Sequence, residues 1–276
     1  MPPMRYLPSR DRLSVLIAVI VLAYTLSRFL NLPALAVDTT LLGSALGLEL
    51  SGPFVIQLLV AALISTGADA LIRAHPRFAA PDGPHTTLAH WIVPGAAALV
   101  LGAGLERLPD GPAWWLGLAA VAVSLTAVLL AEFTVVAPED PGHDTAALAL
   151  NALTYGLALV LFAVLHNIGA RAAIVATIAG GVAAALAWRL FTLNGARAGR
   201  AAFYALITGL VCAEALWAVL YWRMTTGGAA ALLLLVFYIL VGLASQILAG
   251  RFTRRAGLEY GLMALAAGGL IVFLRP

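Results

Sequence analysis

The feature that most constrains this chain is a series of long apolar stretches separated by short gaps that contain arginine. About 20 apolar residues in a helix cross the hydrocarbon core of a bilayer, which is about 30 Å thick. Hydrophobic residues make up 62% of the chain and charged residues 11%. The mean hydropathy is +0.98, far above that of ordinary soluble domains. We therefore expect an all-α, polytopic bundle of transmembrane helices that forms a single domain over residues 1–276. The nine expected spans are residues 13–30, 53–73, 88–108, 113–136, 145–167, 171–193, 201–223, 228–250 and 257–274.

Residues 33–50 are apolar but do not have the length of a span. Only ten residues separate Asp38 from Glu49, which is too few to cross the bilayer as a helix. We expect a short re-entrant or interfacial segment on the outer side of the membrane.

The distribution of arginine tests this topology, because cytoplasmic loops carry an excess of basic residues. With 33–50 kept on one side, and the N-terminus in the cytoplasm, eleven arginines fall inside and five outside. If 33–50 crossed, every later arginine would change sides and the bias would reverse. We therefore expect a multi-pass protein of the inner (plasma) membrane with its N-terminus in the cytoplasm. The eleven inside residues are Arg5, Arg10, Arg12, Arg73, Arg77, Arg189, Arg197, Arg200, Arg251, Arg254 and Arg255.

Three phrases carry a resemblance to a known type of family. They are LSRFLNLP (26–33), LAEFTVVAPEDPGHD (130–144) and FTLNGARAG (191–199). With these phrases the chain resembles an uncharacterised bacterial family of polytopic integral membrane proteins. The resemblance implies a membrane fold and no activity.

Glu214 is the least expected residue of the chain. It lies about two residues from the midpoint of the apolar stretch 201–223, and so about 3 Å from its centre. An ionisable side chain at that depth costs several kcal/mol and is a functional-site candidate by default. Its helical neighbours include Leu210, Trp217 and Tyr221, a face that we expect to contact other helices. Either a protonated, hydrogen-bonded structural glutamate or a proton or ligand site fits this position.

Three residues of the span 145–167 are the expected partners of Glu214. Asn151 and Tyr155 are four residues apart on one helical face at a similar depth, and the face continues to His166 near the outer end. Such a stripe either lines a cavity or supplies hydrogen bonds between helices. We retain it as a candidate ligand or proton route.

A second candidate group gathers at the cytoplasmic ends of the spans. Asp69 and Arg73 are spaced four apart, with the acid first, which favours an ion pair along a helix. His90 begins the third span and Glu132 lies near the end of the fourth. All four can meet around one cytoplasmic vestibule, although anchoring at the membrane interface also explains each of them singly.

Several chemistries are disfavoured. All 16 basic residues are arginine, so no lysine is present to form a Schiff base. The single cysteine, Cys212, cannot form an intramolecular disulfide or a thiolate cluster. Motifs for zinc proteases, phosphate loops and serine hydrolases are missing from the sequence. The basic residues lie in membrane loops, so we expect no nucleic-acid partner. The sequence identifies no cofactor and no metal site.

Three functional hypotheses remain. The first is a non-catalytic accessory or structural subunit of a membrane assembly, in contact with the lipid bilayer and with other subunits or further copies of itself. The second is a small-molecule transporter with a proton or cation site at Glu214. The third is an intramembrane enzyme that uses Asp69, His90 and Glu132, which the missing motifs make the weakest of the three.

Overall fold

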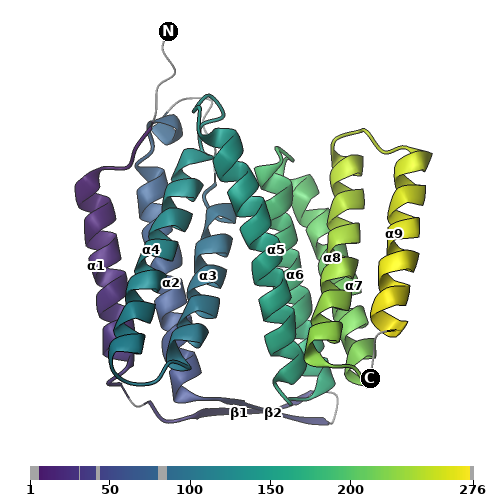
Figure 1. The fold of residues 1–276 in the computed structure, drawn as a ribbon, viewed down its shortest axis with the longest axis horizontal. Helices are drawn as coiled ribbons and strands as arrows, with labels where there is room; N and C mark the ends of the chain where they lie inside the picture. The colour runs from purple at the N-terminus through teal and green to yellow at the C-terminus, as the bar shows by residue number, and fades with distance from the viewer. Residues whose placement is uncertain (1–5, 31, 42–43, 80–85, 274–276) are drawn as a thin grey trace. The chain divides into compact units, whose positions relative to one another are not determined.

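The computed structural model describes residues 6–30, 32–41, 44–79 and 86–273 (Figure 1). Arg5 and Arg275, which entered the count of arginines, lie outside these residues. Nine α-helices and one β-hairpin make up the described part of the chain. In order, the elements are α1 (Arg10–Ser27), β1 (Leu35–Leu41), β2 (Ser44–Leu50), α2 (Gly52–Arg73), a short 3-10 helix η1 (Pro76–Ala79), α3 (Ala89–Glu106), α4 (Pro112–Thr134), α5 (His143–Asn167), α6 (Ala172–Leu193), α7 (Ala198–Leu220), α8 (Thr226–Leu248) and α9 (Arg254–Phe273).

Seven helices, α2 to α8, are long and apolar enough to cross a membrane. The helices α1 and α9 are of similar length but carry three charged residues each, most of them in the first turn. Charged residues at the end of a helix can reach the membrane surface, so they are compatible with a span. The bundle of apolar helices is as expected, while the count of nine spans and the side of each terminus stay predictions.

The segment 33–50 contains a β-hairpin, which the sequence reading did not anticipate. β1 and β2 pair antiparallel, with Leu35 opposite Leu50 and Leu41 opposite Ser44. Both strands have seven residues, fewer than the nine to eleven of a transmembrane strand. A two-stranded sheet also has two unpaired edges, which hydrocarbon does not tolerate. Of the two expected placements, the hairpin therefore favours the interfacial over the re-entrant one.

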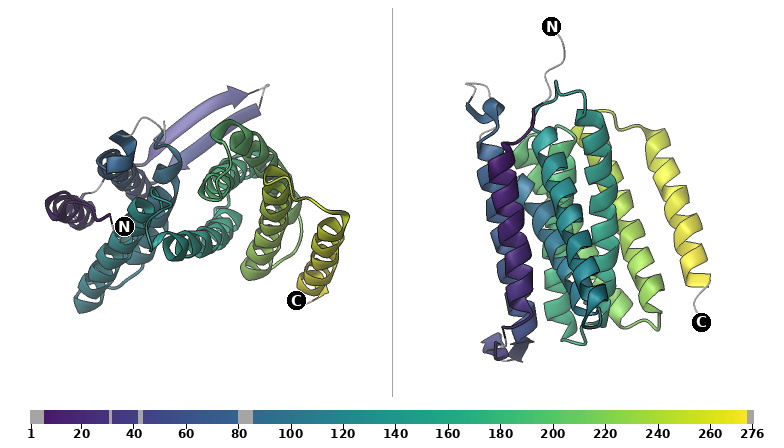
Figure 2. Two further views of the ribbon diagram at one scale, coloured as in Figure 1. Left: turned by 90° about the horizontal axis from the view of Figure 1, so that it is seen from above. Right: turned by 60° about the vertical axis from the view of Figure 1, so that its left-hand side comes forward.

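The chain segments before and after the hairpin meet at Leu32 and Gly52. The carbonyl group of Leu32, before β1, lies directly against Gly52, the first residue of α2. A side chain at position 52 would collide with that carbonyl, which explains the glycine. The strands run across the direction of the helix axes and not along them (Figures 1 and 2). The chain therefore returns to the same end of the helices before α2 begins.

The helices divide into two compact units, Met1–Leu150 and Asn151–Pro276, which we call unit 1 and unit 2. The division falls inside α5. The expected single domain over 1–276 stays a prediction, and each unit is described by itself.

Unit 1 alternates in direction from helix to helix. At one end, the backbone N–H of Tyr6 donates to Asp140 and Arg77 pairs with Glu139, which joins the chain before α1, the α2–α3 connection and the α4–α5 connection. At the other end Arg28, after α1, pairs with Asp110, before α4. Figure 1 shows the same alternation of α1 to α4. We call the first of these the N-terminal end of unit 1.

The core of unit 1 combines close backbone approach with hydrogen bonds between helices. The Tyr24 hydroxyl of α1 donates to the Ala98 carbonyl oxygen of α3 at 2.7 Å, and Gly102 on the same helix leaves room for the Tyr24 ring. Ser65 of α2 donates to the Trp91 carbonyl oxygen at 3.1 Å. These bonds link α3 to both α1 and α2 through directional contacts.

Unit 2 is built on the pair α6 and α7, which approach each other through small residues. A Cβ atom added at Gly209 of α7 would collide with the carbonyl oxygen of Gly180 and lie 2.8 Å from the Ala184 Cβ atom. Gly180 and Ala184 are four residues apart on α6, a small-xxx-small arrangement that lets membrane helices touch along their backbones. The packed face of α7 continues through Cys212 and Leu216, both fully buried.

The helix α8 joins the other helices of unit 2 through aromatic rings. Tyr155 of α5 contacts Phe237 and Tyr238 of α8, at ring distances of 5.8 and 5.6 Å. Tyr238 in turn contacts Tyr260 of α9 at 6.3 Å. At the end of α5, Thr226 donates to the Asn167 side chain at 2.9 Å. The rings and this hydrogen bond set the position of α8 between α5 and α9.

Candidate functional site

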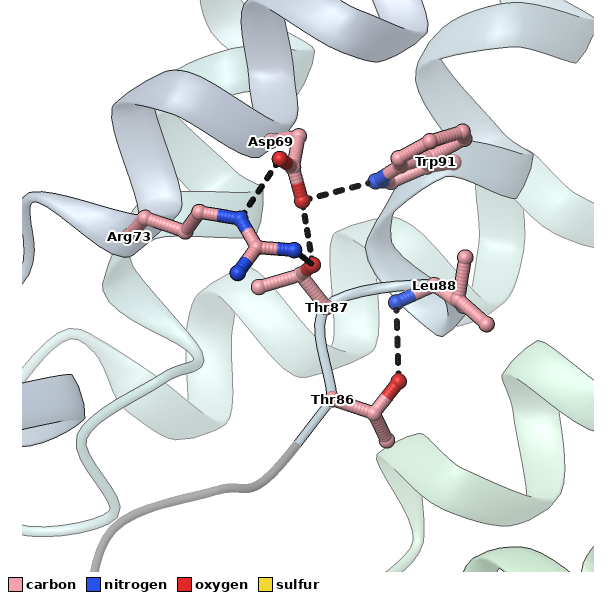
Figure 3. Close-up of polar contacts among 6 residues, drawn as sticks. All are labelled: Asp69, Arg73, Thr86, Thr87, Leu88 and Trp91. Atoms are coloured by element: carbon pink, nitrogen blue, oxygen red, sulfur yellow. Dashed lines mark hydrogen bonds and ion pairs between the residues drawn. The ribbon is translucent and has the colours of Figure 1, made fainter.

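Asp69 is the centre of a hydrogen-bond cluster at the N-terminal end of unit 1 (Figure 3). Its Oδ2 atom accepts from Arg73 Nε at 2.6 Å. Its Oδ1 atom accepts from the Thr87 hydroxyl and from Trp91 Nε1, the latter at 3.0 Å. Arg73 also donates to the Thr87 hydroxyl oxygen at 3.1 Å. Three donors from two elements thus hold one carboxylate, which we call the Asp69 cluster.

Local sequence explains the Asp69 cluster. Asp69 and Arg73 lie one turn apart near the C-terminus of α2. The negative end of the helix dipole also stabilises the positive charge of Arg73 at this position. Thr87 lies two residues before the start of α3 and Trp91 lies in its first turn, so both donors come from the beginning of the next helix. The cluster therefore ties the end of α2 to the beginning of α3.

A second polar pair joins α3 to α4. His90 Nδ1 lies 2.7 Å from Glu132 Oε2. The Glu132 side chain is completely buried and that of His90 is 14% exposed. A buried carboxylate that holds Nδ1 fixes the orientation of the imidazole ring and leaves Nε2 as the atom that can exchange a proton with a third group. The pair is the strongest candidate for acid–base chemistry among the described residues.

The four residues expected at one vestibule therefore form two groups. Asp69 and Arg73 share their contacts with Thr87 and Trp91, whereas His90 pairs with Glu132. His90 and Trp91 are adjacent in α3, and successive residues of a helix point about 100° apart. The two side chains therefore reach different neighbours, Glu132 and Asp69. Sequence reasoning identified all four residues but missed Thr87 and Trp91. Only the position of Thr87 before an apolar run, as for a helix cap, could have indicated its role.

His75 adds a buried imidazole to the same end of unit 1. It is 1% exposed and lies between the rings of Tyr6 and Phe133, at 4.9 and 4.6 Å. Its Nδ1 atom accepts from the backbone N–H of Arg77 at 3.1 Å, while Nε2 is buried with no partner among the described residues. Burial lowers the pKa of His75, so the ring is held neutral. Sequence reasoning missed this residue.

Around His75, the ion pair of Arg77 and Glu139 is exposed. Arg77 Nη1 lies 2.5 Å from Glu139 Oε2, with 36% and 50% of the two side chains exposed. A hydrogen bond from its own backbone N–H, and then Arg77, hold the pKa of Glu139 below its usual value. The pair connects η1 to the turn before α5 and closes this end of the unit.

Glu214 lies on the outward face of α7. Its side chain is exposed and makes no hydrogen bond or ion pair with any residue that the structure describes. Phe203, Leu210, Trp217 and Tyr221 share this face and are between 47% and 76% exposed. The helix begins at Ala198, so Glu214 lies about 7.5 Å beyond its midpoint, farther than the 3 Å expected. The expected packing of this face against other helices of the chain does not occur among the described residues.

The three expected partners of Glu214 lie on α5. Tyr155 contacts the rings of α8, as described above, and Asn151 lies one turn before it and is part-buried. His166 is near the end of α5, with Nδ1 shielded from solvent and without a hydrogen-bond partner in the described part of the chain. Tyr155 is thus engaged by α8, and no described contact links it to Glu214. The route from Glu214 through Tyr155 to His166 stays a prediction.

The polar groups described above take part in hydrogen bonds and ion pairs. Among the described residues, no three His, Cys, Asp or Glu side chains come together as ligands for a metal ion. Cys212 is buried between α7 and its neighbours. Asp69 and Glu132 of unit 1 are held by hydrogen bonds, whereas Glu214 in unit 2 faces outward and has no partner among the described residues.

The fold defines the class of protein as an apolar helical bundle with seven helices suited to crossing a membrane. More narrowly, the chain belongs to the family described as protein of unknown function (DUF5656), whose model matches residues 32–274. The expected resemblance to an uncharacterised family is confirmed, while the bacterial origin stays a prediction. No curated protein matches the chain, and no solved structure does.

Proposed function

We propose that this chain is a non-catalytic, multi-pass subunit of a membrane assembly, and that the outward face of α7 is where a transmembrane helix of another subunit packs. This face consists of Phe203, Leu206, Ile207, Leu210, Glu214, Trp217 and Tyr221. The observation that carries the proposal is the exposed Glu214 without a described partner. A partner helix supplies a hydrogen-bond donor or a basic side chain to this carboxylate.

The cost of an uncovered Glu214 supports the proposal. Acidic residues within a membrane helix face a protein interior or a water-filled cavity, because lipid offers them no partner, and an aspartate at the helix centre costs about 3 kcal/mol on insertion scales. Trp217 and Tyr221, next to Glu214 on the same face, supply large apolar surface with polar tips, a composition enriched at protein interfaces. A helix that covers the face removes the cost and buries the aromatic rings.

The acids of unit 1 favour the same conclusion. Asp69 accepts three hydrogen bonds and Glu132 is held by His90, so both already serve to join helices. We infer that they stabilise the bundle and do not act on a substrate.

For the assembly we further propose nine spans in the inner membrane, with the N-terminus in the cytoplasm. The return of the hairpin to Gly52 supports this arrangement, because it keeps residues 33–50 on one side. The N-terminal end of unit 1 then carries Arg10, Arg12, Arg73 and Arg77 to the cytoplasm, as the bias of basic residues in loops predicts.

Site-directed cross-linking tests the proposal. In a Cys212→Ala background, single cysteines are placed at Leu210, Trp217 and Tyr221 on the outward face, and at Ala205, Leu216 and Val219 on the packed face of α7. In native membranes, a membrane-permeable thiol cross-linker should join only the outward set to another subunit. Cross-links from neither set, with the protein migrating as a monomer in mild detergent, would contradict the proposal.

The variant Glu214→Gln separates this function from transport. Removing the charge while keeping the size of the side chain should weaken the assembly, measured by native mass, and leave the folded subunit intact. Glu259→Gln, on the exposed start of α9 and paired with Arg255, is the matched control and should have no effect. An unchanged assembly combined with a loss of pH-dependent solute uptake would instead support the transporter hypothesis.

A further inference from the structure

Two adjoining cavities on the surface of unit 1 form one continuous depression between α1 and α2. The first, of about 330 Å³, lies at the N-terminal end of the unit. The second, of about 480 Å³, runs along the two helices. They share Arg12 and Leu71 as lining residues, so the second cavity begins where the first ends. The depression lies on a different unit from the α7 face and does not depend on the proposed assembly.

The long cavity is apolar over most of its length. Apart from Asp11 and Arg12 at its head, its lining consists of aliphatic residues and a glycine: Val15, Leu16, Val19, Gly67, Ala70 and Leu71. From Arg12 to Val19 it extends about 10 Å along α1. Gly67 allows the Leu16 side chain to close its floor, because a Cβ atom there would collide with Leu16. The groove suits a hydrocarbon chain that lies along the helices.

The short cavity includes two polar residues, Ser9 and Arg12, in its lining. The other lining residues are Leu7, Pro8, Leu71, Ala74, Pro76 and Phe133, and the Ser9 side chain caps no backbone group of α1. Arg12 is exposed and makes no ion pair with any described residue. The first turn of α1 holds Arg10, Asp11 and Arg12, so its charge is net positive, and the positive end of the helix dipole adds to it. A guanidinium with free donors beside a hydroxyl suits a phosphate group.

We propose that this depression binds one anionic phospholipid, with the headgroup phosphate on Arg12 and Ser9 and an acyl chain in the groove between α1 and α2. The arrangement of the two cavities is the basis for assigning a phospholipid. The short cavity has a cation at the end of a helix, which matches an anionic headgroup, and the apolar groove that leads inward from it matches an acyl chain. Arginine at such a position attracts anionic headgroups at the membrane surface. Arg10, two residues before Arg12, is not among the lining residues and serves as an internal reference.

Binding is tested on the full chain in detergent by native mass spectrometry, with phosphatidylglycerol and phosphatidylcholine that carry the same acyl chains. The wild-type chain should retain phosphatidylglycerol preferentially. Arg12→Gln should weaken retention about fivefold, whereas Arg10→Gln should change it less than twofold. Equal losses in the two variants would show general surface attraction and would overturn the site, as would equal retention of the two lipids by the wild-type chain.

The groove is tested separately with Ala70→Leu, which fills it from α2. This variant should lose long-chain phosphatidylglycerol but keep dihexanoyl-phosphatidylglycerol, whose chains are too short to reach Ala70. Ala62→Leu, two turns earlier on the exposed side of α2, is the control and should bind both like the wild type. Melting temperatures without lipid identify any variant that fails to fold, and Val19→Gln then replaces it, with the same loss expected.

Inorganic phosphate distinguishes a lipid from a free anion. Long-chain phosphatidylglycerol should raise the melting temperature of the wild-type chain, and phosphate at the same concentration should not. Equal stabilisation by phosphate, or unchanged lipid retention in Ala70→Leu, would overturn the assignment to a lipid.

Discussion

Unit 1 and unit 2 hold their helices together by different means. In unit 1, side chains from neighbouring elements meet in directional polar contacts: Tyr24 with Ala98, the Asp69 cluster, and His90 with Glu132. In unit 2, the helices α6 and α7 touch through Gly180, Ala184 and Gly209. Aromatic rings then join α8 to its neighbours.

The two kinds of packing differ in which polar side chains they leave without a partner. Directional contacts engage Asp69 and Glu132 of unit 1, so that these two acids serve the fold. Backbone contact between α6 and α7 in unit 2 requires small residues on one face of α7. It does not restrict which residues occupy the opposite face. Glu214 occupies that opposite face, which is why this acid of unit 2 has no partner among the described residues.

The largest effect is expected from breaking the His90–Glu132 pair. His90→Ala leaves a fully buried carboxyl group without its 2.7 Å partner, and breaking a buried pair costs about 3–5 kcal/mol. Because Glu132 also takes part in a further interaction, we expect the loss in the free energy of unfolding to lie near the lower limit of this range. Unfolding in mixed micelles, followed by tryptophan fluorescence, measures it.

The double variant His90→Leu with Glu132→Met distinguishes pairing from simple packing. Replacing both members with apolar residues should recover more than half of the loss, as for other buried pairs. A double variant that is less stable than His90→Ala would mean that Glu132 contributes independently of His90.

The next largest effect is expected from Gly209→Ala in unit 2. The added Cβ atom collides with the Gly180 carbonyl oxygen, a backbone atom that cannot move aside alone. Overpacking of this kind costs about 1–3 kcal/mol. Gly181→Ala, on α6 with nothing within 4 Å of the added atom, should stay within about 0.5 kcal/mol of the wild type. Similar stabilities of the two variants would argue against backbone contact between α6 and α7.

A smaller effect is expected from acid on His75. Burial lowers its pKa, so below the ordinary histidine value of about 6.5 the unfolded chain takes up a proton that the folded chain does not. Stability should therefore fall as the pH drops from 7 to 5. His75→Phe, which can still pack against Tyr6 and Phe133, should flatten this dependence of the melting temperature.

Glu139 does not interfere in this range. Its pKa is lowered, so its contribution is present above the ordinary glutamate value, about 4.3, and is lost only at lower pH. A melting temperature that falls equally between pH 7 and 5 in the wild type and in His75→Phe would place the titrating group elsewhere.

The smallest effect is expected from Arg77→Gln. Both members of the Arg77–Glu139 pair are at least one-third exposed, and exposed ion pairs contribute about 0–1 kcal/mol. We expect a change in this range that shrinks further in 0.5 M salt. A loss above 2 kcal/mol would show that the pair closes the N-terminal end of unit 1 more strongly than its exposure implies.

The sequence predicted the helices well and their faces poorly. Hydropathy located all nine described helices to within about three residues, because a span needs a fixed length of apolar chain. α1, α7 and α9 begin three residues earlier than expected, since arginines and small residues next to an apolar run can extend the helix. For α7 this shift moves Glu214 away from the midpoint.

Two other features could not be predicted from the hydropathy pattern: the β-hairpin and the orientation of Glu214. The strands of the hairpin, Leu35–Leu41 and Ser44–Leu50, are short apolar runs, for which periodicity does not separate strand from helix. The outward orientation of Glu214 depends on which face of α7 fits α6. A helix that is apolar nearly all round gives little indication of this, and the close approach of Gly209 and Ala213 to α6 is seen only in the structure. For Asp69 and Arg73, by contrast, spacing along one helix was sufficient.

The return of the chain to Gly52 separates the length of the α1–α2 connection from the geometry of the bundle. Leu32 and Gly52 are in contact, so residues 33–51 form a loop whose two ends lie together. A short turn in place of this loop would leave α1 and α2 undisturbed. The same property makes the hairpin a natural position for grafting an epitope or a glycosylation acceptor. A reporter inserted there would reveal the side of the membrane without altering the spans.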